Sequence, residues 1–261
     1  MLTLTNSQAS IHDFLIHDVA EYLARNGITT QVVTTGTWDE RNATLDASEI
    51  DMGWICGAPY VNKIARGVPL KILAAPVMAH PRYENRPVYF SIVVVRADAQ
   101  YKTFANLRGA RWAYNEKNSH SGFHVVRYFL ATRNLNGNFF RRVVESGAHQ
   151  YSVELILCGD VDAAAIDRTV LEMMSANEPS PVSRLRVIET IGPGPMPPFV
   201  IGGHVSEGIR LYIQHALVTM HKKVDGAEIL ARARIARVAN IRDADYDRIR
   251  EMLRIAKATR L

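Results

Sequence analysis

The stretch Val88-Tyr89-Phe90-Ser91-Ile92-Val93-Val94-Val95-Arg96 decides the fold of this 261-residue chain. It is the longest run rich in β-branched and aromatic residues, and as a strand it would extend about 30 Å at ~3.3 Å per residue. Such a strand is long enough to run from one lobe of a protein into another. Strand-like and helix-like segments alternate on both sides of it, which predicts crossover connections, mostly parallel sheets and helices on their faces.

The elements around this run predict two lobes. Before it, strands are expected at residues 2–4, 28–33, 50–55 and 70–76. After it, strands are expected at residues 110–114, 142–144, 161–167 and 185–190, followed by a rigid Gly- and Pro-rich crossing at 191–198. The chain after Val205 is expected to be helical throughout. The prediction is an α/β protein with one lobe from residues 1–90 and 196–261 and an inserted lobe from 91–195, with the ligand cleft between them.

Composition excludes several classes of protein. Hydrophobic residues make up 48% and charged residues 22%, which is typical of a globular protein. No apolar run approaches the roughly 18 residues of a membrane span, and the first residues lack the pattern of a signal peptide. We therefore expect a cytoplasmic protein or a chain whose leader has been removed. With only Cys56 and Cys158, neither a disulfide framework nor a Cys-rich zinc site is expected.

The net charge of +5 is concentrated near the C-terminus, where residues 221–261 hold 11 Lys and Arg against 6 Asp and Glu. We interpret this stretch as the solvated face of C-terminal helices. A nucleic-acid surface would need an aromatic platform or a helix-turn-helix, and neither is recognisable, so no nucleic-acid partner is expected. No Gly-rich phosphate-loop pattern occurs, and no cofactor or metal is predicted.

The segment Tyr114-Asn115-Glu116-Lys117-Asn118-Ser119-His120-Ser121-Gly122-Phe123 carries the clearest chemical signal. A strand ends, a polar loop follows and a helix begins, so two hydroxyls and several backbone N–H groups meet at a helix N-terminus. That arrangement favours an oxyanion. The alternative is that Ser119 or Ser121 merely caps the helix.

Other candidates follow strand ends. His149 and Asp167 each stand between a predicted strand and a predicted helix, where they could contact a ligand or simply begin the helix. The aromatic residues Trp38, Tyr60 and Tyr89 lie near strand ends of the first lobe and could be ligand contacts, core or rim. Catalysis has little support, because no Gly-x-Ser-x-Gly elbow is present and Cys56 has no evident base.

Six segments, in order, resemble those of one family. They are Ile50-Asp51-Met52-Gly53-Trp54, Pro87 to Val94, Asn118 to Phe123, Ser146-Gly147-Ala148-His149, Val161-Asp162-Ala163-Ala164 and Gly192 to Pro198. Over about residues 11–203 the chain resembles the substrate-binding proteins of phosphate, phosphite and phosphonate ABC transporters, which have the type II periplasmic-binding-protein fold. The resemblance implies a non-enzymatic protein that closes by a hinge on a small oxyanion and feeds an ABC permease.

The resemblance also implies site residues. The anion would be held by Ser119, the backbone N–H of His120, Ser121, His149 and Tyr89, with Trp38 where better-known members have Tyr. Thr169 stands where members that bind aminoalkylphosphonates have a carboxylate, Asp167 lies two residues earlier, and the Gly192–Pro198 crossing has no acid. The other end of the ligand is therefore expected to differ. Two alternatives stay open: a cytoplasmic enzyme that reuses this fold, as in futalosine-pathway menaquinone or thiamine-precursor synthesis, and a ligand sensor.

Overall fold

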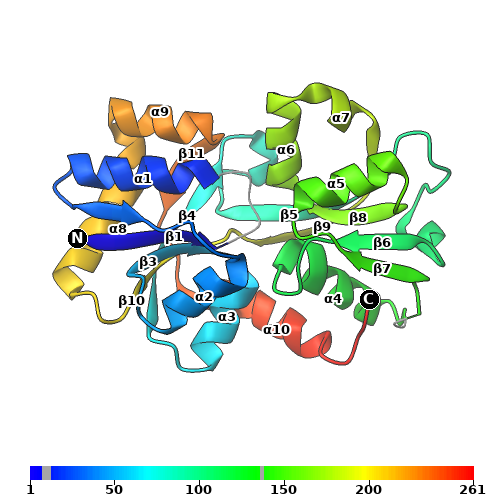
Figure 1. Ribbon diagram of the computed structural model, residues 1–261, viewed down its shortest axis with the longest axis horizontal. Helices are drawn as coiled ribbons and strands as arrows, with labels where there is room; N and C mark the ends of the chain where they lie inside the picture. Colours follow the sequence, from blue (N-terminus) through cyan, green and yellow to red (C-terminus); the bar gives the residue numbers. More distant parts are fainter. Residues whose placement is uncertain (8–12, 136–137) are drawn as a thin grey trace. The chain divides into compact units, whose positions relative to one another are not determined.

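The computed structural model describes residues 1–7, 13–135 and 138–261, and the chain divides into two compact units (Figure 1). The described part of unit 1 comprises residues 1–7, 13–88 and 195–247. That of unit 2 comprises residues 89–135, 138–194 and 248–261. The chain thus passes between the units after Val88, after Gly194 and after Asp247.

Unit 1 is built on a six-stranded sheet in the order β11-β4-β10-β3-β1-β2. Its strands are β1 (Leu2–Ser7), β2 (Thr30–Val32), β3 (Met52–Ile55), β4 (Leu70–Met78), β10 (Phe199–Gly202) and β11 (Ile235–Ala239). Strand β1 pairs in parallel with β2 and β3, whereas β10 runs antiparallel to β3 and β4, and β11 antiparallel to β4. The sheet is therefore mixed.

Helices cover both faces of this sheet, with α1 and α9 on one face and α2 and α3 on the other (Figure 1). The helices of unit 1 are α1 (Asp13–Arg25), α2 (Trp38–Asp46), α3 (Gly57–Ala65), α8 (Glu207–Thr219) and α9 (Val224–Arg232). Short 3-10 turns lie at η1 (Pro81–Tyr83), η4 (Met220–Lys222) and η5 (Asp243–Tyr246). Helix α1 shows how apolar spacing places one face of a helix in the core. Leu15, Val19 and Leu23 recur at helical spacing, and all three are buried.

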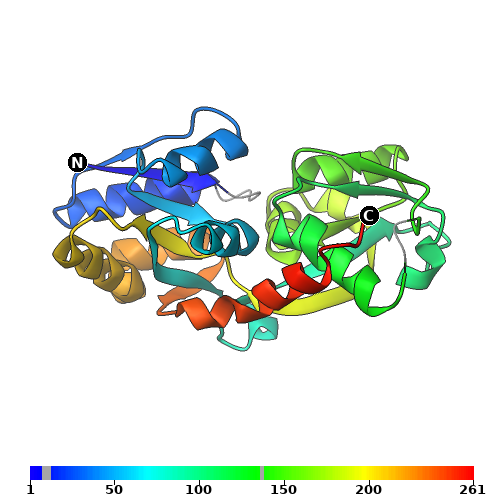
Figure 2. The ribbon, with the colours of Figure 1, turned by 90° about the horizontal axis from the view of Figure 1, so that it is seen from below.

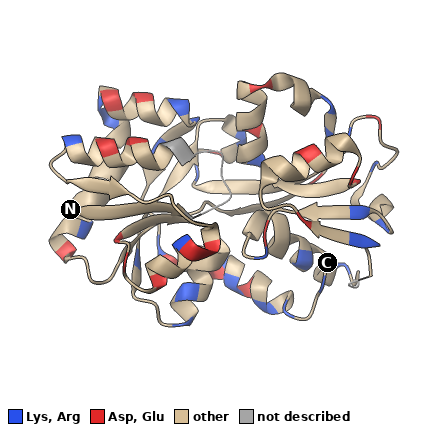
Figure 3. Cartoon of the chain, viewed as in Figure 1, with Lys and Arg blue, Asp and Glu red and all other residues tan. Residues whose placement is uncertain are grey.

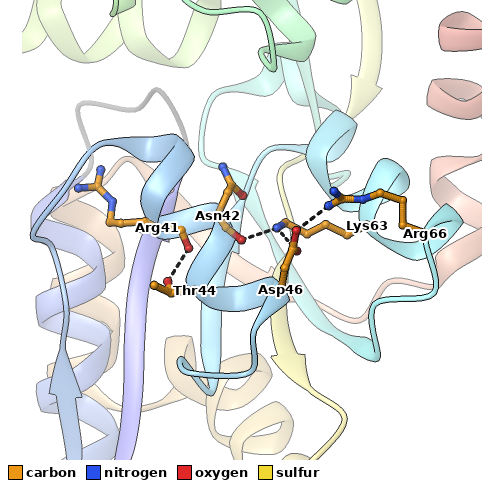
Figure 4. Close-up of polar contacts among 6 residues, drawn as sticks. All are labelled: Arg41, Asn42, Thr44, Asp46, Lys63 and Arg66. Atoms are coloured by element: carbon orange, nitrogen blue, oxygen red, sulfur yellow. Dashed lines mark hydrogen bonds and ion pairs between the residues drawn. The ribbon is translucent and has the colours of Figure 1, made fainter.

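A polar network around the buried Lys63 joins α2 to α3 (Figure 4). Lys63 is 2% exposed, and its ammonium donates to the Asn42 carbonyl at 2.6 Å and pairs with the Asp46 carboxylate. The second Asp46 oxygen accepts from Arg66 at 2.6 Å. Burial lowers the pKa of Lys63, and the Asp46 carboxylate opposes that shift. The network fixes the end of α2 against α3.

Unit 2 has a five-stranded sheet in the order β7-β6-β8-β5-β9. Its strands are β5 (Val88–Arg96), β6 (Arg111–Tyr114), β7 (Arg142–Glu145), β8 (Ala163–Asp167) and β9 (Leu185–Pro195). Strand β6 pairs in parallel with β7 and β8, and β5 runs antiparallel to β8. The helical elements are η2 (Phe104–Leu107), the π-helical turn η3 (His120–His124), α4 (Val125–Thr132), α5 (His149–Cys158), α6 (Arg168–Asn177), α7 (Pro179–Ser183) and α10 (Asp247–Ile255).

The central residues of β5, from Ile92 to Val95, are apolar and buried, and they face two core clusters. Val93 and Val95 belong to one core cluster, which includes residues of η2, α4 and α10. Ile92 and Val94 belong to a second cluster with residues of α5 and β8. The two clusters lie on opposite sides of the sheet because successive side chains of a strand alternate. Helix α5 accordingly lies on one face and α4 on the other (Figures 1 and 2).

The structure corrects three predictions. Both sheets are mixed rather than mostly parallel. The chain after Val205 is not all helix, because Arg234 has a left-handed backbone (φ 57°) just after α9 and β11 follows, with Ile235 and Val238 buried. The segment expected to be a rigid crossing from residue 191 is partly strand, since β9 continues to Pro195.

The C-terminal residues also lie elsewhere than expected. Residues 248–261 pack in unit 2, not with residues 1–90 as the expected lobe boundaries had it. Met252 joins the unit 2 core, and the Arg127 guanidinium donates to the carbonyls of Ala256 at 2.8 Å and Thr259 at 2.6 Å. Arg127 of α4 thereby holds the segment that follows α10 within unit 2.

Candidate functional site

The polar segment after β6 forms the start of a helical run in unit 2. Ser119 is the residue that caps η3, and its hydroxyl accepts from the Gly122 N–H at 3.1 Å. The π-helical turn continues directly into α4. Ser119, His120 and Ser121 are all buried, at 2–4% exposure, so the start of the run is fixed within the unit. The first N–H groups of such a run lack intrahelical acceptors and favour an anion.

Ser121 and His149 meet at this point. The Ser121 hydroxyl lies 3.1 Å from His149 Nε2, and the Ser121 carbonyl accepts from the Ser91 hydroxyl at 2.7 Å. His149 is the first residue of α5, follows Ala148 and is 1% exposed. The loops after β6 and β7 run side by side here, because the Gly147 N–H donates to the Asn115 carbonyl at 2.8 Å. Serine and histidine therefore come together from two strand ends.

Tyr89 and His120 lie together on another side of the same turn. Their ring centroids are 6.3 Å apart, and a side chain at Gly194 would contact both rings. With Ser91 and Met252 they line a pocket of about 10 Å³, which has room for about one water molecule and is too small for a phosphonate. The His120 ring thus belongs to the packing of unit 2.

Asp167 ends β8 directly opposite Ser91 of β5. Its carboxylate caps α6, since Oδ1 accepts from both the backbone N–H and the hydroxyl of Thr169 at 2.8 Å. Burial raises the pKa of Asp167 to about 7, and the Thr169 hydrogen bonds oppose that shift. The structure shows Asp167 as a helix cap, and its contact with a ligand stays a prediction.

The histidines of this region are neutral near pH 7. Burial lowers the pKa of His149 to about 3 and that of His124 to about 3. It lowers the pKa of His120 to about 4, with a further contribution from the charge of Arg248. A neutral imidazole can still donate one hydrogen bond to an anion, and a bound anion would favour its protonated form.

Trp38 and Tyr60 lie in unit 1. Trp38 is the half-buried first residue of α2, whose start is held by a capping box of Thr37 and Glu40. Tyr60 is 2% exposed, its hydroxyl donates to Asp243 at 2.6 Å, and its ring packs edge-on against Tyr246. The structure thus gathers Tyr89, Ser119, His120, Ser121, His149 and Asp167 within unit 2, and it places the other two candidates in unit 1.

Sequence reasoning did not select three residues that shape this region. Ser91 holds the Ser121 carbonyl, Asn115 is fully buried beside the turn, and His124 is 9% exposed. A serine inside the apolar run 88–96 was the available signal for Ser91. The four-residue spacing between His120 and His124 was the signal for His124, because it places both on one side of a helix.

Comparison with known proteins identifies the family. Residues 5–246 match the model of the family described as ABC transporter, phosphonate, periplasmic substrate-binding protein. The chain belongs to this family. The match covers most of both units, and it agrees with the phosphonate-binding family expected from the six sequence segments.

Solved structures of phosphonate-binding proteins share the fold. PhnD1 from Prochlorococcus marinus (MIT 9301), in complex with methylphosphonate, is 18% identical, with a TM-score of 0.87 and 98% of each chain covered. A binding-protein component of an ABC phosphonate transporter from Pseudomonas aeruginosa is 16% identical, with a TM-score of 0.85 and coverage of 98% of this chain and 86% of that one. The periplasmic aliphatic sulphonate-binding protein SsuA from Escherichia coli is 14% identical, with a TM-score of 0.65 and coverage of 99% and 93%.

Two features of the described chain accompany this family assignment. Among the residues that the structure describes, no helix is long and apolar enough to cross a membrane. Within the same residues, no three His, Cys, Asp or Glu side chains lie close enough together to hold a metal ion.

Proposed function

We propose that this member of the phosphonate-binding family holds a phosphonate-class oxyanion at the start of η3, through the hydroxyls of Ser119 and Ser121 and the imidazole of His149. The observation that carries the proposal is the hydrogen bond of 3.1 Å between Ser121 and His149 at a buried helix start. The Ser119 oxygen already accepts from Gly122, so its proton remains for an acceptor such as a ligand oxygen. Bonds from such donors to a charged oxygen are stronger than those between neutral groups.

The electrostatics of unit 2 support an anionic ligand. The unit contains 17 Lys and Arg against 11 Asp and Glu, whereas unit 1 contains 14 against 15. Figure 3 shows basic residues on β6, β7 and α10. A net positive unit raises the local concentration of an anion. A neutral buried imidazole can donate one hydrogen bond to that anion and carries no negative charge that would repel it.

The Ser121–His149 pair does not support an enzyme. A serine nucleophile needs a base whose pKa lies near the working pH, and the pKa of His149 is lowered to about 3. A third group that orients such a base is usually a carboxylate. In the part of the chain that the structure describes, no carboxylate is hydrogen-bonded to the His149 ring. The group that opposes the lowering of the His149 pKa is the backbone of Ala165 and not a carboxylate. The pair is therefore suited to holding an anion, and an ABC permease is the proposed recipient of the ligand.

Calorimetry with methylphosphonate, phosphite and phosphate tests the proposal, with acetate as a carboxylate control. We expect at least one of the three phosphorus oxyanions to bind with 1:1 stoichiometry and acetate to bind more weakly. Native mass spectrometry of the purified protein would show a co-purified ligand. Phosphorus NMR of the bound ligand after long incubation separates the two classes of function. Binding without chemical change is expected, and turnover would support the enzyme alternative instead.

A further inference from the structure

Asn115, the residue after β6, has a fully buried side-chain amide at 0% exposure. Neither its Oδ1 nor its Nδ2 has a hydrogen-bond partner among the residues that the structure describes. Its backbone is held, because the Asn115 carbonyl accepts from the Gly147 N–H at 2.8 Å. A buried amide without partners is unusual in a folded protein, and it calls for a structural or functional reason.

Gly122 gives that reason by its position. A Cβ atom at residue 122 would lie 1.9 Å from Asn115 Oδ1, 3.0 Å from Asn115 Cγ and 3.3 Å from His149 Cε1. The first distance is shorter than any contact between real atoms of this kind, so the Asn115 amide fills the space that a side chain at residue 122 would take. A side chain at residue 122 therefore fits only if the Asn115 amide moves away.

The contact lies at the centre of the candidate site. Gly122 follows Ser121, whose hydroxyl is 3.1 Å from His149 Nε2, and the Gly122 N–H donates to the Ser119 hydroxyl at 3.1 Å. Any shift of Gly122 therefore moves both serines, and it also presses on the His149 ring. The Asn115 amide limits such a shift.

We propose that Asn115 and Gly122 form a matched pair that sets the position of Ser121 relative to His149 and thereby the affinity for a phosphonate oxyanion. Asn115 is a positioning residue, since it acts through Gly122. The part of this inference that concerns affinity rests on the proposed function, whereas the part that concerns geometry does not.

The experiment compares Gly122→Ala, Asn115→Ala and the double variant Asn115→Ala/Gly122→Ala. Calorimetry measures methylphosphonate affinity, and ¹H–¹³C NMR of the protein without ligand follows the His149 Cε1–H resonance, assigned by its loss in His149→Gln. We expect Gly122→Ala to weaken binding by at least about tenfold and Asn115→Ala by about threefold, because contacting residues couple energetically. The double variant should bind better than Gly122→Ala, since removal of Oδ1 and Cγ makes room for the new methyl group.

The NMR signal gives a readout that a general loss of stability would not move in this pattern. We expect a displaced His149 resonance in Gly122→Ala and a return toward the wild-type position in the double variant. Gly208→Ala is the matched control, because a Cβ atom at residue 208 would meet nothing within 4 Å, so affinity and resonance should stay unchanged. If Gly122→Ala does not fold, Asn115→Ala alone still decides, and wild-type affinity with an unmoved resonance would overturn the inference.

The outcomes separate this inference from the proposed function. If the wild-type protein binds none of the phosphorus oxyanions and the resonances still follow the expected pattern, the proposed function fails and the matched pair stands. If the wild-type protein binds methylphosphonate and the double variant is no better than Gly122→Ala, the pair is wrong and the function stands.

Discussion

The two units share an architecture of mixed sheets with flanking helices, and they differ in where the polar side chains near their strand ends find partners. In unit 1 the Tyr60 hydroxyl donates to Asp243, the Tyr246 hydroxyl to the Met196 carbonyl, and the Trp54 indole to the Pro197 carbonyl, at 2.6–3.0 Å. In unit 2 the described residues leave the ring of His124 and the amide of Asn115 without a hydrogen-bond partner. Buried polar atoms without a partner also occur among the described residues of unit 1, such as the Tyr22 hydroxyl. What distinguishes unit 2 is that the Asn115 amide lies beside Gly122, in the turn that holds Ser119 and Ser121.

Net charge follows the same division. Unit 2 carries an excess of six positive charges and unit 1 an excess of one negative charge. The C-terminal residues 248–261 contribute much of the excess, since they contain five Lys and Arg and a single Glu. Sequence alone assigned these charges to a solvated helical face. Because residues 248–261 pack with unit 2, their charges contribute to the electrostatic potential of the unit that contains the candidate site.

The largest expected effect comes from removal of both hydroxyls of the candidate site. In Ser119→Ala/Ser121→Ala, each lost bond to a charged oxygen removes about 1.5–3 kcal/mol of binding free energy, so affinity for methylphosphonate falls by roughly 10²-fold or more. Ser206→Ala in unit 1 is the matched control, because Ser206 caps α8 in the same way. Calorimetry measures both. If the double variant kept wild-type affinity, the serines of unit 2 would be no more important for ligand binding than the capping serine of unit 1.

Acid should destabilise unit 2 through its buried histidines. The pKa of His124 is about 3 in the folded protein, below the value of about 6.5 for an exposed histidine. As pH falls below about 6.5 the unfolded state therefore takes up the proton first, and stability is lost progressively toward pH 3.

The variant His124→Gln isolates this contribution. Between pH 7.5 and pH 5 we expect the wild-type protein to lose about 2 kcal/mol more unfolding free energy than the variant, because the variant has no imidazole to protonate. Urea unfolding at both pH values measures the difference. His17→Gln on the exposed surface of α1 serves as the control and should behave like the wild-type protein. Equal pH dependence in wild type and His124→Gln would contradict the assignment.

Tyr60→Phe tests unit 1 directly. Loss of the hydroxyl that donates to Asp243 should lower the unfolding free energy by about 1 kcal/mol. Methylphosphonate affinity should stay within about twofold of wild type, since the hydroxyl is already bonded within the unit. Thermal unfolding and calorimetry give the two values. A large loss of affinity would return Tyr60 to the ligand contacts that the sequence suggested.

The smallest effect is expected at Asp167. Because its Oδ1 caps α6 and its pKa is raised to about 7, Asp167→Asn should change methylphosphonate affinity by less than about twofold. A single such carboxyl compensates an ammonium poorly, so 2-aminoethylphosphonate should bind more weakly than a phosphonate with a hydroxylated tail. Competition calorimetry decides this. If 2-aminoethylphosphonate is the tightest ligand, the role given to Asp167 is wrong.

Much of the fold could be predicted because it depends on local patterns. The bounds of β5 coincide with the quoted run 88–96, and the start of β8 at residue 163 lies within two residues of its predicted position. Where the pattern was ambiguous, prediction failed. The segment 235–239 has apolar residues at a spacing that suits helix or strand, and its pairing with β4 decided the outcome.

The candidate site was predictable in its residue types and not in its contacts. Ser119 and Ser121 stand where a strand gives way to a helix, which is a local signal. The approach of His149 to Ser121 joins residues 28 positions apart, and it depends on the parallel pairing of β6 with β7. The contact between Asn115 and Gly122 depends on how tightly the turn closes over a buried amide.

The sequence by itself therefore determined the alternation of strands and helices, the long strand at residues 88–96 and the hydroxyl pair at a helix start. Hydrophobic periodicity and capping preference act between near neighbours, so they can be read along the chain. Only the tertiary structure decided that residues 248–261 pack with unit 2, that Tyr60 bonds Asp243, and that Asn115 occupies the space beside Gly122. These outcomes depend on close packing between distant segments, where tenths of an ångström decide which atom fits.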